Sequence, residues 1–175
     1  LFMRSLATRR RHSATSEALK DVIALYQLAG FDLIVVETAG IGQSDTEIVD
    51  FVDLSLYVMT SEYGAASQLE KIDMLDYADM VVLNKFEKRG ADDALRDVRK
   101  QWRRNHPDRM KIADDLVPVF PTIASRFNDP GVNHLFGAIC GRLKWGVGDV
   151  GPVAFTSHAA LIPADRVRYL AEIAQ

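Results

Sequence analysis

Strand-length apolar runs alternate with helix-length periodic stretches along most of this 175-residue chain. Three runs are β-rich and almost continuously apolar: Phe31–Glu37 (FDLIVVE), Leu54–Thr60 (LSLYVMT) and Met80–Asn84 (MVVLN). Val117–Pro121 (VPVFP) is a fourth, weaker run. Continuous apolar runs are typical of parallel strands covered on both faces. The alternation therefore predicts an α/β fold built on a mostly parallel sheet.

The stretches between these runs carry apolar residues at helical spacing. They cover Ser16–Ala29, Ala65–Tyr77, Ala91–Asn105 and Val132–Leu143. Gly30 follows the first of them, at the position where a glycine commonly ends a helix. Helices that connect parallel strands form right-handed crossovers, so we expect flanking helices on both faces of the sheet.

The amino-acid composition of the sequence changes after Trp145. The segment Gly146–Pro152 holds three glycines and a proline, a composition typical of linkers. We interpret residues 1–145 as the greater part of one α/β domain, and residues 146–175 as a linker and the start of a following domain. We also expect both ends of the chain to lie inside a longer protein.

Composition narrows the possible functions. The formal net charge of −3 does not indicate a nucleic acid partner. No apolar run approaches the ~20 residues that a membrane span needs. The single cysteine, Cys140, excludes an intramolecular disulfide framework and indicates a reducing compartment. The four histidines lack the mutual spacing of a metal site.

Polar segments follow three of the predicted strands. They are Glu37–Asp45 (ETAGIGQSD), Asn84–Glu87 (NKFE) and Thr122–Ser125 (TIAS). Ligands of open α/β sheets bind at the carboxyl ends of the strands, where these segments would meet. An acid there can hold Mg²⁺ through a water, and a nearby glycine can turn its N–H toward a phosphate. An asparagine, a lysine and an acid suit a guanine base, because a carboxylate accepts two of its N–H groups.

Each segment also has a purely local interpretation. Glu37–Gly40 could be a strand-ending turn, and Asn84–Glu87 could be a helix-capping surface loop. Gln43 lies three residues after Gly40, whereas a water-positioning glutamine is expected next to such a glycine. The occurrence of the segments at successive strand ends favours a nucleotide site over either local interpretation.

Together the segments resemble the later nucleotide motifs of P-loop GTPases. The glutamate of E-x-x-G and the following GQSD resemble the MeaB/ArgK-like G-protein chaperones of adenosylcobalamin-dependent acyl-CoA mutases. Longer matching text, such as FMRSLATR and TEIVDFVDLSLYVMTSEYGAASQLEK, resembles the family of fused isobutyryl-CoA mutases. The resemblance covers residues 1–140 well and the tail IPADRVRYLAEI moderately. In that family one chain carries a cobalamin-binding domain, a GTPase domain, a linker and a substrate-binding barrel.

The resemblance implies a three-layer P-loop NTPase-type fold and a GTPase that gates cofactor loading and protects the mutase. Glu37 would hold the Mg²⁺ water, and Gly40 would meet the γ-phosphate. Gln43 is a further candidate catalytic residue. Ser61–Lys71 would be the switch loop that reports the nucleotide state to the mutase.

The resemblance also assigns the base-reading residues. Asn84, Lys85 and Glu87 would contact the guanine, and Ala124 would donate its backbone N–H to it. The motif normally ends in aspartate. The extra methylene of Glu87 moves the carboxylate outward by about 1.5 Å, which leaves the preference between GTP and ATP open.

The implied partners are GTP or GDP with Mg²⁺ and the cobalamin-binding and substrate-binding domains of the same parent chain. Adenosylcobalamin and the acyl-CoA would bind in those domains. The parent would be a cytoplasmic bacterial homodimer that interconverts isobutyryl-CoA and n-butyryl-CoA. No nucleic acid or membrane partner is expected.

One motif of the family is absent from the sequence. No G-x-x-x-x-G-K-[ST] phosphate loop occurs in the 175 residues, so we expect the first strand and this loop to lie upstream. The chain alone should then bind nucleotide poorly and be inactive. Two alternatives remain open: a free-standing MeaB-type chaperone of a separate methylmalonyl-CoA-type mutase, and a degenerate, non-hydrolysing interaction module.

Overall fold

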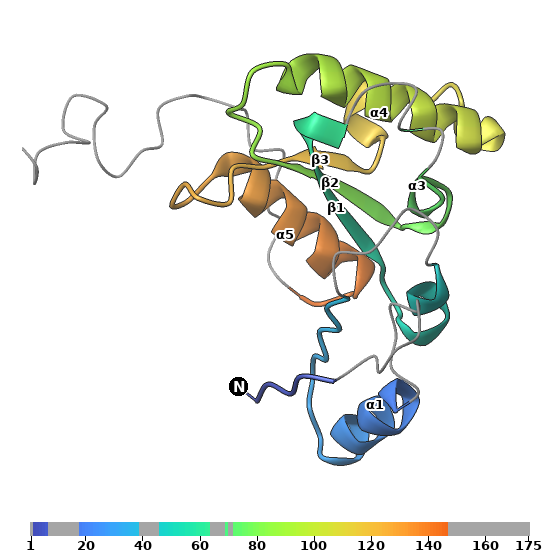
Figure 1. Cartoon of the computed structure of the whole chain (residues 1–175), viewed down its shortest axis with the longest axis vertical. Helices are drawn as coiled ribbons and strands as arrows, with labels where there is room; N and C mark the ends of the chain where they lie inside the picture. The colour runs from blue at the N-terminus through green and yellow to red at the C-terminus, as the bar shows by residue number, and fades with distance from the viewer. Residues whose placement is uncertain (1, 7–17, 39–45, 64–68, 70–71, 147–175) are drawn as a thin grey trace, which may run out of the picture.

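The computed structural model describes residues 2–6, 18–38, 46–63, 69 and 72–146. Its centre is a three-stranded parallel sheet with the strand order β1-β2-β3 (Figure 1). The strands are β1 (Leu56–Thr60), β2 (Met80–Asn84) and β3 (Val119–Pro121). This sheet and its flanking helices confirm the predicted α/β class and fit part of a P-loop NTPase-type domain.

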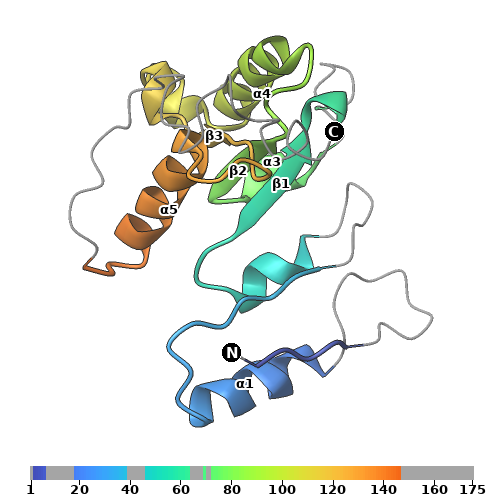
Figure 2. The same ribbon diagram turned by 90° about the vertical axis from the view of Figure 1, so that its left-hand side faces the viewer.

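Helices cover both faces of the sheet. The short α3 (Met74–Tyr77) and the long α4 (Ala91–Asn105) lie on one side, and α5 (Pro130–Arg142) lies on the other (Figures 1 and 2). The central strand β2 is buried from Met80 to Leu83. Burial on both faces explains why its sequence is a continuous apolar run instead of an alternating one.

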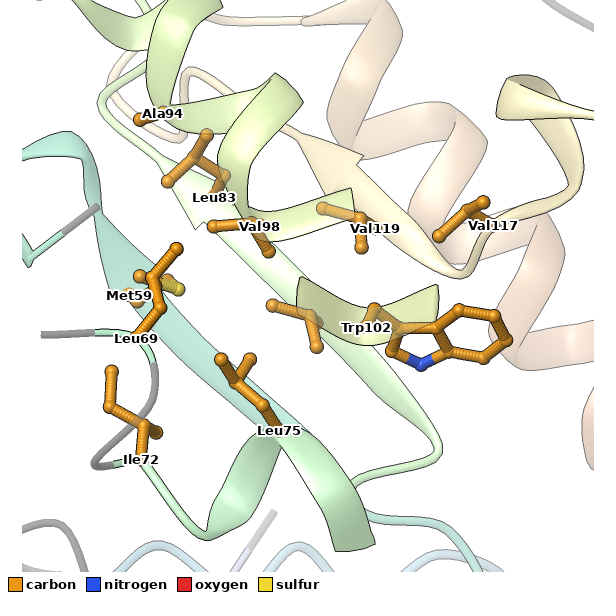
Figure 3. Packing of buried hydrophobic residues seen from close by; sticks show 11 residues of the cluster. Met59, Leu69, Ile72, Leu75, Leu83, Ala94, Val98, Trp102, Val117 and Val119 are labelled. Carbon is orange, nitrogen blue, oxygen red and sulfur yellow. The ribbon is translucent and has the colours of Figure 1, made fainter. Parts of the chain in front are cut away.

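The main core fills the space between the sheet and α4 (Figure 3). Val98 and Trp102 of α4 are 0% and 2% exposed, and they pack with Val81 and Leu83 of β2 in this cluster. The acidic first turn and basic last turn of α4 also match the helix dipole. The predicted helix over Ala91–Asn105 is therefore confirmed, and Val98 and Trp102 lie on its buried face.

A reciprocal hydrogen-bond pair aligns the starts of β1 and β2. The backbone N–H and the hydroxyl of Ser55 both donate to Asp79 Oδ2 at 2.9 Å, and the Asp79 N–H donates to Ser55 Oγ at 3.0 Å. The next residues, Leu56 and Met80, form the first registered pair of the two strands. The polar pair thus lies immediately before the first registered pair and helps to hold the two strands in this register.

The first helix, α1 (Leu19–Leu28), lies away from the sheet in both views (Figures 1 and 2). Gly30 has φ +78°, its N–H donates to Gln27 O, and the Phe31 N–H donates to Tyr26 O. This is a Schellman C-terminus, and the rings of Tyr26 and Phe31 lie 5.3 Å apart beside it. Gly30 therefore ends the helix as predicted.

The prediction of a strand over Phe31–Glu37 is wrong for this structure. Residues 31–38 contain no strand, and the side chains of Leu33 and Val35 are 51% and 79% exposed. Strand propensity describes how side chains fit a paired and covered surface. No described strand lies beside this segment to pair with it, so its apolar sequence does not produce a strand.

The remaining predictions differ mainly in their boundaries. The predicted strands over Leu54–Thr60 and Val117–Pro121 are shorter in the structure, and the predicted helix over Val132–Leu143 starts earlier.

Of the predicted helix over Ala65–Tyr77, residues 65–68, 70 and 71 lie outside the described residues. Residues 147–175, most of the predicted linker and following domain, also lie outside them. The described residues also contain short 3₁₀ helices that were not predicted: η1 (Glu47–Phe51), η2 (Ser61–Tyr63), η3 (Pro107–Arg109) and η4 (Asp114–Leu116). Within the described ranges, no helix has the length and apolar character needed to cross a bilayer.

The start of α5 presses directly on the end of β3. A Cβ built on Gly131 would lie 2.0 Å from the carbonyl oxygen of Pro121, a backbone atom that cannot swing away. A Cβ on Gly141, near the other end of the same helix, would meet nothing within 4 Å. The first glycine is therefore required by close packing, whereas the second is not.

These two glycines provide a matched pair of substitutions. We expect Gly131→Ala to lower the free energy of unfolding by about 1–3 kcal/mol, because the helix and the strand must separate. Gly141→Ala should raise it by up to about 1 kcal/mol, because alanine restricts the unfolded chain more than glycine does. Urea unfolding followed by circular dichroism measures both, and equal effects would contradict the proposed contact.

Candidate functional site

The side chain of Asn84 ties together the segments that follow two neighbouring strands. Asn84 is the last residue of β2, and its Oδ1 accepts hydrogen bonds from the Thr122 hydroxyl at 3.2 Å and from the Ala124 N–H at 3.1 Å. Thr122 follows directly after β3 and is 3% exposed. A single amide thus holds the first residues of the loop after β3.

Backbone hydrogen bonds continue the link beyond the strands. The Thr122 N–H donates to Leu83 O at 3.0 Å, and the Phe86 N–H donates to Thr122 O at 3.1 Å. Phe86 also packs against the main core as a partly buried residue. The segment Asn84–Glu87 is therefore anchored at Asn84 and at Phe86.

Lys85 has a backbone conformation that is unusual for its residue type. Its φ is +57°, in the left-handed region that non-glycine residues seldom adopt. Such strain persists only where the surroundings determine it, and here the neighbours Asn84 and Phe86 are both anchored. The reversal at Lys85 lets the chain leave β2 and turn along the sheet edge.

Lys85 and Glu87 are both exposed, next to the anchored Asn84. The site therefore offers the aliphatic stem of Lys85 and the carboxylate of Glu87. Both lie beside the Asn84 amide and the Ala124 backbone N–H, which are held by their mutual hydrogen bond. A flat, polar ring can be covered by the lysine stem while its N–H groups donate to the carboxylate. The structure brings together Asn84, Lys85, Glu87 and Ala124, which were all predicted to read a base.

Of the residues predicted for phosphate and metal chemistry, only Glu37 lies within the described ranges, and it is not part of a strand. Glu37 is exposed and lies in the segment without a strand, so it does not end a strand beside Asn84. Gly40 and Gln43 lie outside the described residues. The described part of the chain contains no group of three or more His, Cys, Asp or Glu that could hold a metal ion. The described residues thus fit a nucleotide base, whereas they do not by themselves fit Mg²⁺.

An ion pair connects this loop to the segment after β1. Lys88 pairs with Glu62 of η2, the first part of the predicted switch loop Ser61–Lys71. The hydrogen bond and the charge of Lys88 hold the pKa of Glu62 below its ordinary value of 4.5. Desolvation opposes them with a smaller effect, and the charge of Lys85 lowers the pKa by a still smaller amount. The rest of the predicted switch loop, apart from Leu69, lies outside the described residues.

Sequence reasoning missed two residues that shape this site. Lys88 lies directly after NKFE, and its pairing with Glu62 has no sequence signal, since the two residues are far apart in the chain. Asp129 accepts hydrogen bonds from the loop after β3 and from the start of α5. Its signal was present: an aspartate followed by proline is typical of a helix N-cap with proline at the first helical position.

The strain at Lys85 gives a prediction about stability. We expect Lys85→Gly to raise the free energy of unfolding by up to about 1 kcal/mol, because glycine adopts a positive φ without a steric penalty. The control is Lys100→Gly, an exposed position inside α4, which should lower it by about 1 kcal/mol. Urea unfolding measures both changes. A loss of stability in Lys85→Gly similar to that of Lys100→Gly would contradict the strain.

The Glu62–Lys88 pair predicts a titration change. Because the pKa of Glu62 is lowered in the folded chain, the pair stabilises the fold above pH 4.5, and this contribution disappears as the pH falls through the lowered pKa. Lys88→Met should shift the pKa of Glu62 back up toward 4.5. Carboxyl NMR titration measures the shift, with Lys100→Met as the control. An unchanged pKa of Glu62 would mean that the two groups do not interact in solution.

Comparison with known proteins connects this geometry to a family. The family model of the methylmalonyl-CoA mutase-associated GTPase MeaB matches residues 1–143. The fused isobutyryl-CoA mutase of Paraburkholderia xenovorans is 54% identical to this chain, over 100% of the chain and 14% of that protein. The fused isobutyryl-CoA mutase of Cupriavidus metallidurans is 53% identical, over 99% of the chain and 17% of that protein.

A shorter similarity exists to a GTPase with a different name. The GTPase ArgK of Escherichia coli is 31% identical over 48% of this chain and 25% of its own length. The chain therefore spans about one-sixth or less of the length of the fused mutases, and they match 99–100% of its own length. Because the family model covers most of the chain and these relatives match it over nearly its whole length, the chain belongs to the MeaB family of GTPases.

Proposed function

We propose that this chain is the base-reading part of a GTPase domain within a fused acyl-CoA mutase. The observation that carries the proposal is the extent of similarity: the fused isobutyryl-CoA mutases match 99–100% of the chain. The family model ends at residue 143, so the match to the fused proteins extends beyond the GTPase region. A continuous match of this kind favours a fused arrangement over a free-standing one.

The proposed nucleotide is GTP, bound with its base at the ends of β2 and β3. Support comes from the anchoring of Asn84 to Thr122 and Ala124, beside the exposed Lys85 and Glu87. The Glu87 carboxylate would accept hydrogen bonds from the base, and the Lys85 stem would cover its ring. A site built this way discriminates because a base without matching donors leaves polar groups unpaired.

Hydrolysis of the γ-phosphate is the proposed reaction. When bound, Mg²⁺ would neutralise charge at the phosphates. Glu37 would orient a water of the ion, and Gly40 would offer its N–H to the terminal phosphate. Gln43 is the further residue proposed to act near the attacking water. Because these groups follow one another closely in sequence, nucleotide turnover would order and release the same short segment.

The proposed role of the reaction is to gate the loading of adenosylcobalamin and to protect the mutase. The partners would be the cobalamin-binding and substrate-binding domains of the parent chain, assembled as a homodimer. Isobutyryl-CoA is the acyl-CoA that the names of the fused relatives indicate for the parent. The Glu62–Lys88 pair would pass changes at the base site to Ser61–Lys71, the proposed switch loop.

One observation favours a second candidate function. Glu87 stands where the base-reading motif of this family normally has aspartate, and it moves the acceptor outward by about one bond length, roughly 1.5 Å. A domain that no longer selects guanine could act as a non-hydrolysing interaction module. This candidate predicts neither a preference for GDP over ADP nor phosphate release from GTP.

The experiment uses the protein encoded by the complete open reading frame. We expect calorimetric titration with Mg²⁺ to show tighter binding of GDP than of ADP, and phosphate release to be specific for GTP. Glu87→Gln should weaken GDP binding by about tenfold or more, because two hydrogen bonds to a charged acceptor are changed.

The matched control is Asp92→Asn, another exposed acid, in the first turn of α4. It should leave the dissociation constant of GDP within about twofold of the wild-type value, since surface charges alone contribute little. Equal binding of GDP and ADP by the wild-type protein, without GTP hydrolysis, would reject the GTPase proposal in favour of the interaction module.

A further inference from the structure

We infer that Asp129 is a positioning residue that sets the guanine specificity of the base-reading loop, an inference that rests on the proposed function. Asp129 precedes α5 and is 5% exposed. Its Oδ1 accepts hydrogen bonds from the backbone N–H groups of Val132 at 3.0 Å and of Ile123 at 3.1 Å. One carboxylate oxygen therefore joins a helix start to the loop after β3.

Only one of these two bonds is explained by the helix. The bond from Val132 is an ordinary N-cap, which serine, threonine or asparagine would also form. The bond from Ile123 adds nothing to the helix. A buried carboxylate is costly to desolvate, so its second bond to a loop residue has a purpose beyond capping.

The second bond lies between the two contacts of Asn84. Thr122 and Ala124 are held by Asn84 Oδ1, and Ile123 between them is held by Asp129 Oδ1. Three consecutive residues are thus fixed alternately from β2 and from α5. The place of the Ala124 N–H is set by both side chains, although Asp129 lies outside the base-reading motifs.

The surroundings make this arrangement rigid. The Arg126 N–H donates to Ile123 O at 2.9 Å and closes a turn just after the anchored residues. Gly131 brings α5 against Pro121 so closely that a Cβ would lie 2.0 Å from the carbonyl oxygen of Pro121. The end of β3, the loop and the start of α5 therefore form one corner, with Asp129 at its centre.

The position of the Ala124 N–H matters for choosing between bases. Guanine carries a carbonyl oxygen, an acceptor, at the place where adenine carries an amino group, a donor. In this structure the Ala124 N–H donates to Asn84 Oδ1, so a bound base would have to share that hydrogen or take it over. An N–H held at this place would then attract guanine and oppose adenine. Displacing the loop should reduce the preference for guanine over adenine, and a simple loss of helix stability would not change that ratio.

The test compares variants that keep or lose the second bond. Asp129→Asn retains an oxygen at the same place and should keep both bonds. Asp129→Ser keeps the helix cap, but its hydroxyl is about one bond length, roughly 1.5 Å, shorter in reach, so the bond from Ile123 is lost. Asp129→Thr is a second capping variant with the same expectation. The control is Asp73→Ser, since Asp73 precedes α3 and its side chain forms no cap hydrogen bond.

The measurement is calorimetric titration of the protein from the complete open reading frame with GDP and with ADP, in the presence of Mg²⁺. We expect Asp129→Ser and Asp129→Thr to lower the melting temperature only slightly, since the helix cap remains, but to lower the ratio of the ADP to the GDP dissociation constant by about tenfold, the effect of one lost hydrogen bond to the base. Asp129→Asn and Asp73→Ser should keep the wild-type ratio.

The possible failures are distinguishable. Wild-type protein that binds GDP no better than ADP would reject the proposed function, and this inference with it. Wild-type protein that selects GDP, together with capping variants that keep the ratio within about twofold, would overturn the inference alone. A similar loss of selectivity in Asp129→Asn would also overturn it, because the charge would then act instead of the positioned oxygen.

Discussion

The burial of β2 on both faces is the constraint on which the rest of this structure depends. Val81 and Leu83 are completely buried, and β2 pairs in parallel with β1 on one side and β3 on the other. Parallel strands need crossover connections, so α4 must cross from the end of β2 to the start of β3. The same constraint brings the carboxyl ends of β2 and β3 to one edge, where the polar residues that follow them meet.

At this edge, different residues order the loop and face the solvent. Asn84, the residue at which β2 ends, supplies the acceptor that orders the neighbouring loop. Lys85 then takes a positive φ, which turns the chain and leaves its side chain and that of Glu87 exposed. Polar groups that fix the loop are buried or half-buried, whereas those that would meet a ligand are exposed. This division lets the site be ordered before any ligand binds.

The sequence alone predicted an element correctly where its local pattern agrees with the tertiary packing. The strand Met80–Asn84 and the helix Ala91–Asn105 were predicted with their observed bounds. A continuous apolar run favours a strand buried on both faces, and apolar residues at helical spacing favour a helix with one buried face. Gly30 was recognised because only a positive φ suits a Schellman end. The residues predicted to read a base do lie at strand ends, as their places directly after apolar runs indicated, while their role stays a prediction.

The wrong strand prediction and the two missed contacts have a common physical cause. Phe31–Glu37 has the composition of a buried strand, but a strand also needs a neighbour, and sequence pattern carries no information on whether one is present. The pairing of Lys88 with Glu62 and the bond from Ile123 to Asp129 likewise join residues brought together only by folding. These contacts depend on which chain segments lie side by side in the fold, and the periodicity of the sequence carries no information about that.

The two halves of the proposed nucleotide site therefore differ in what determines them. Reading a base needs a few groups at adjacent strand ends, and β2 and β3 supply them within one small sheet. Phosphate chemistry needs Glu37 to end a strand beside them, and that placement depends on pairing that residues 31–38 do not make here. The groups proposed to read a base are thus placed by the local fold of this chain. The catalytic arrangement instead requires Glu37 to be brought to the same edge by a further strand.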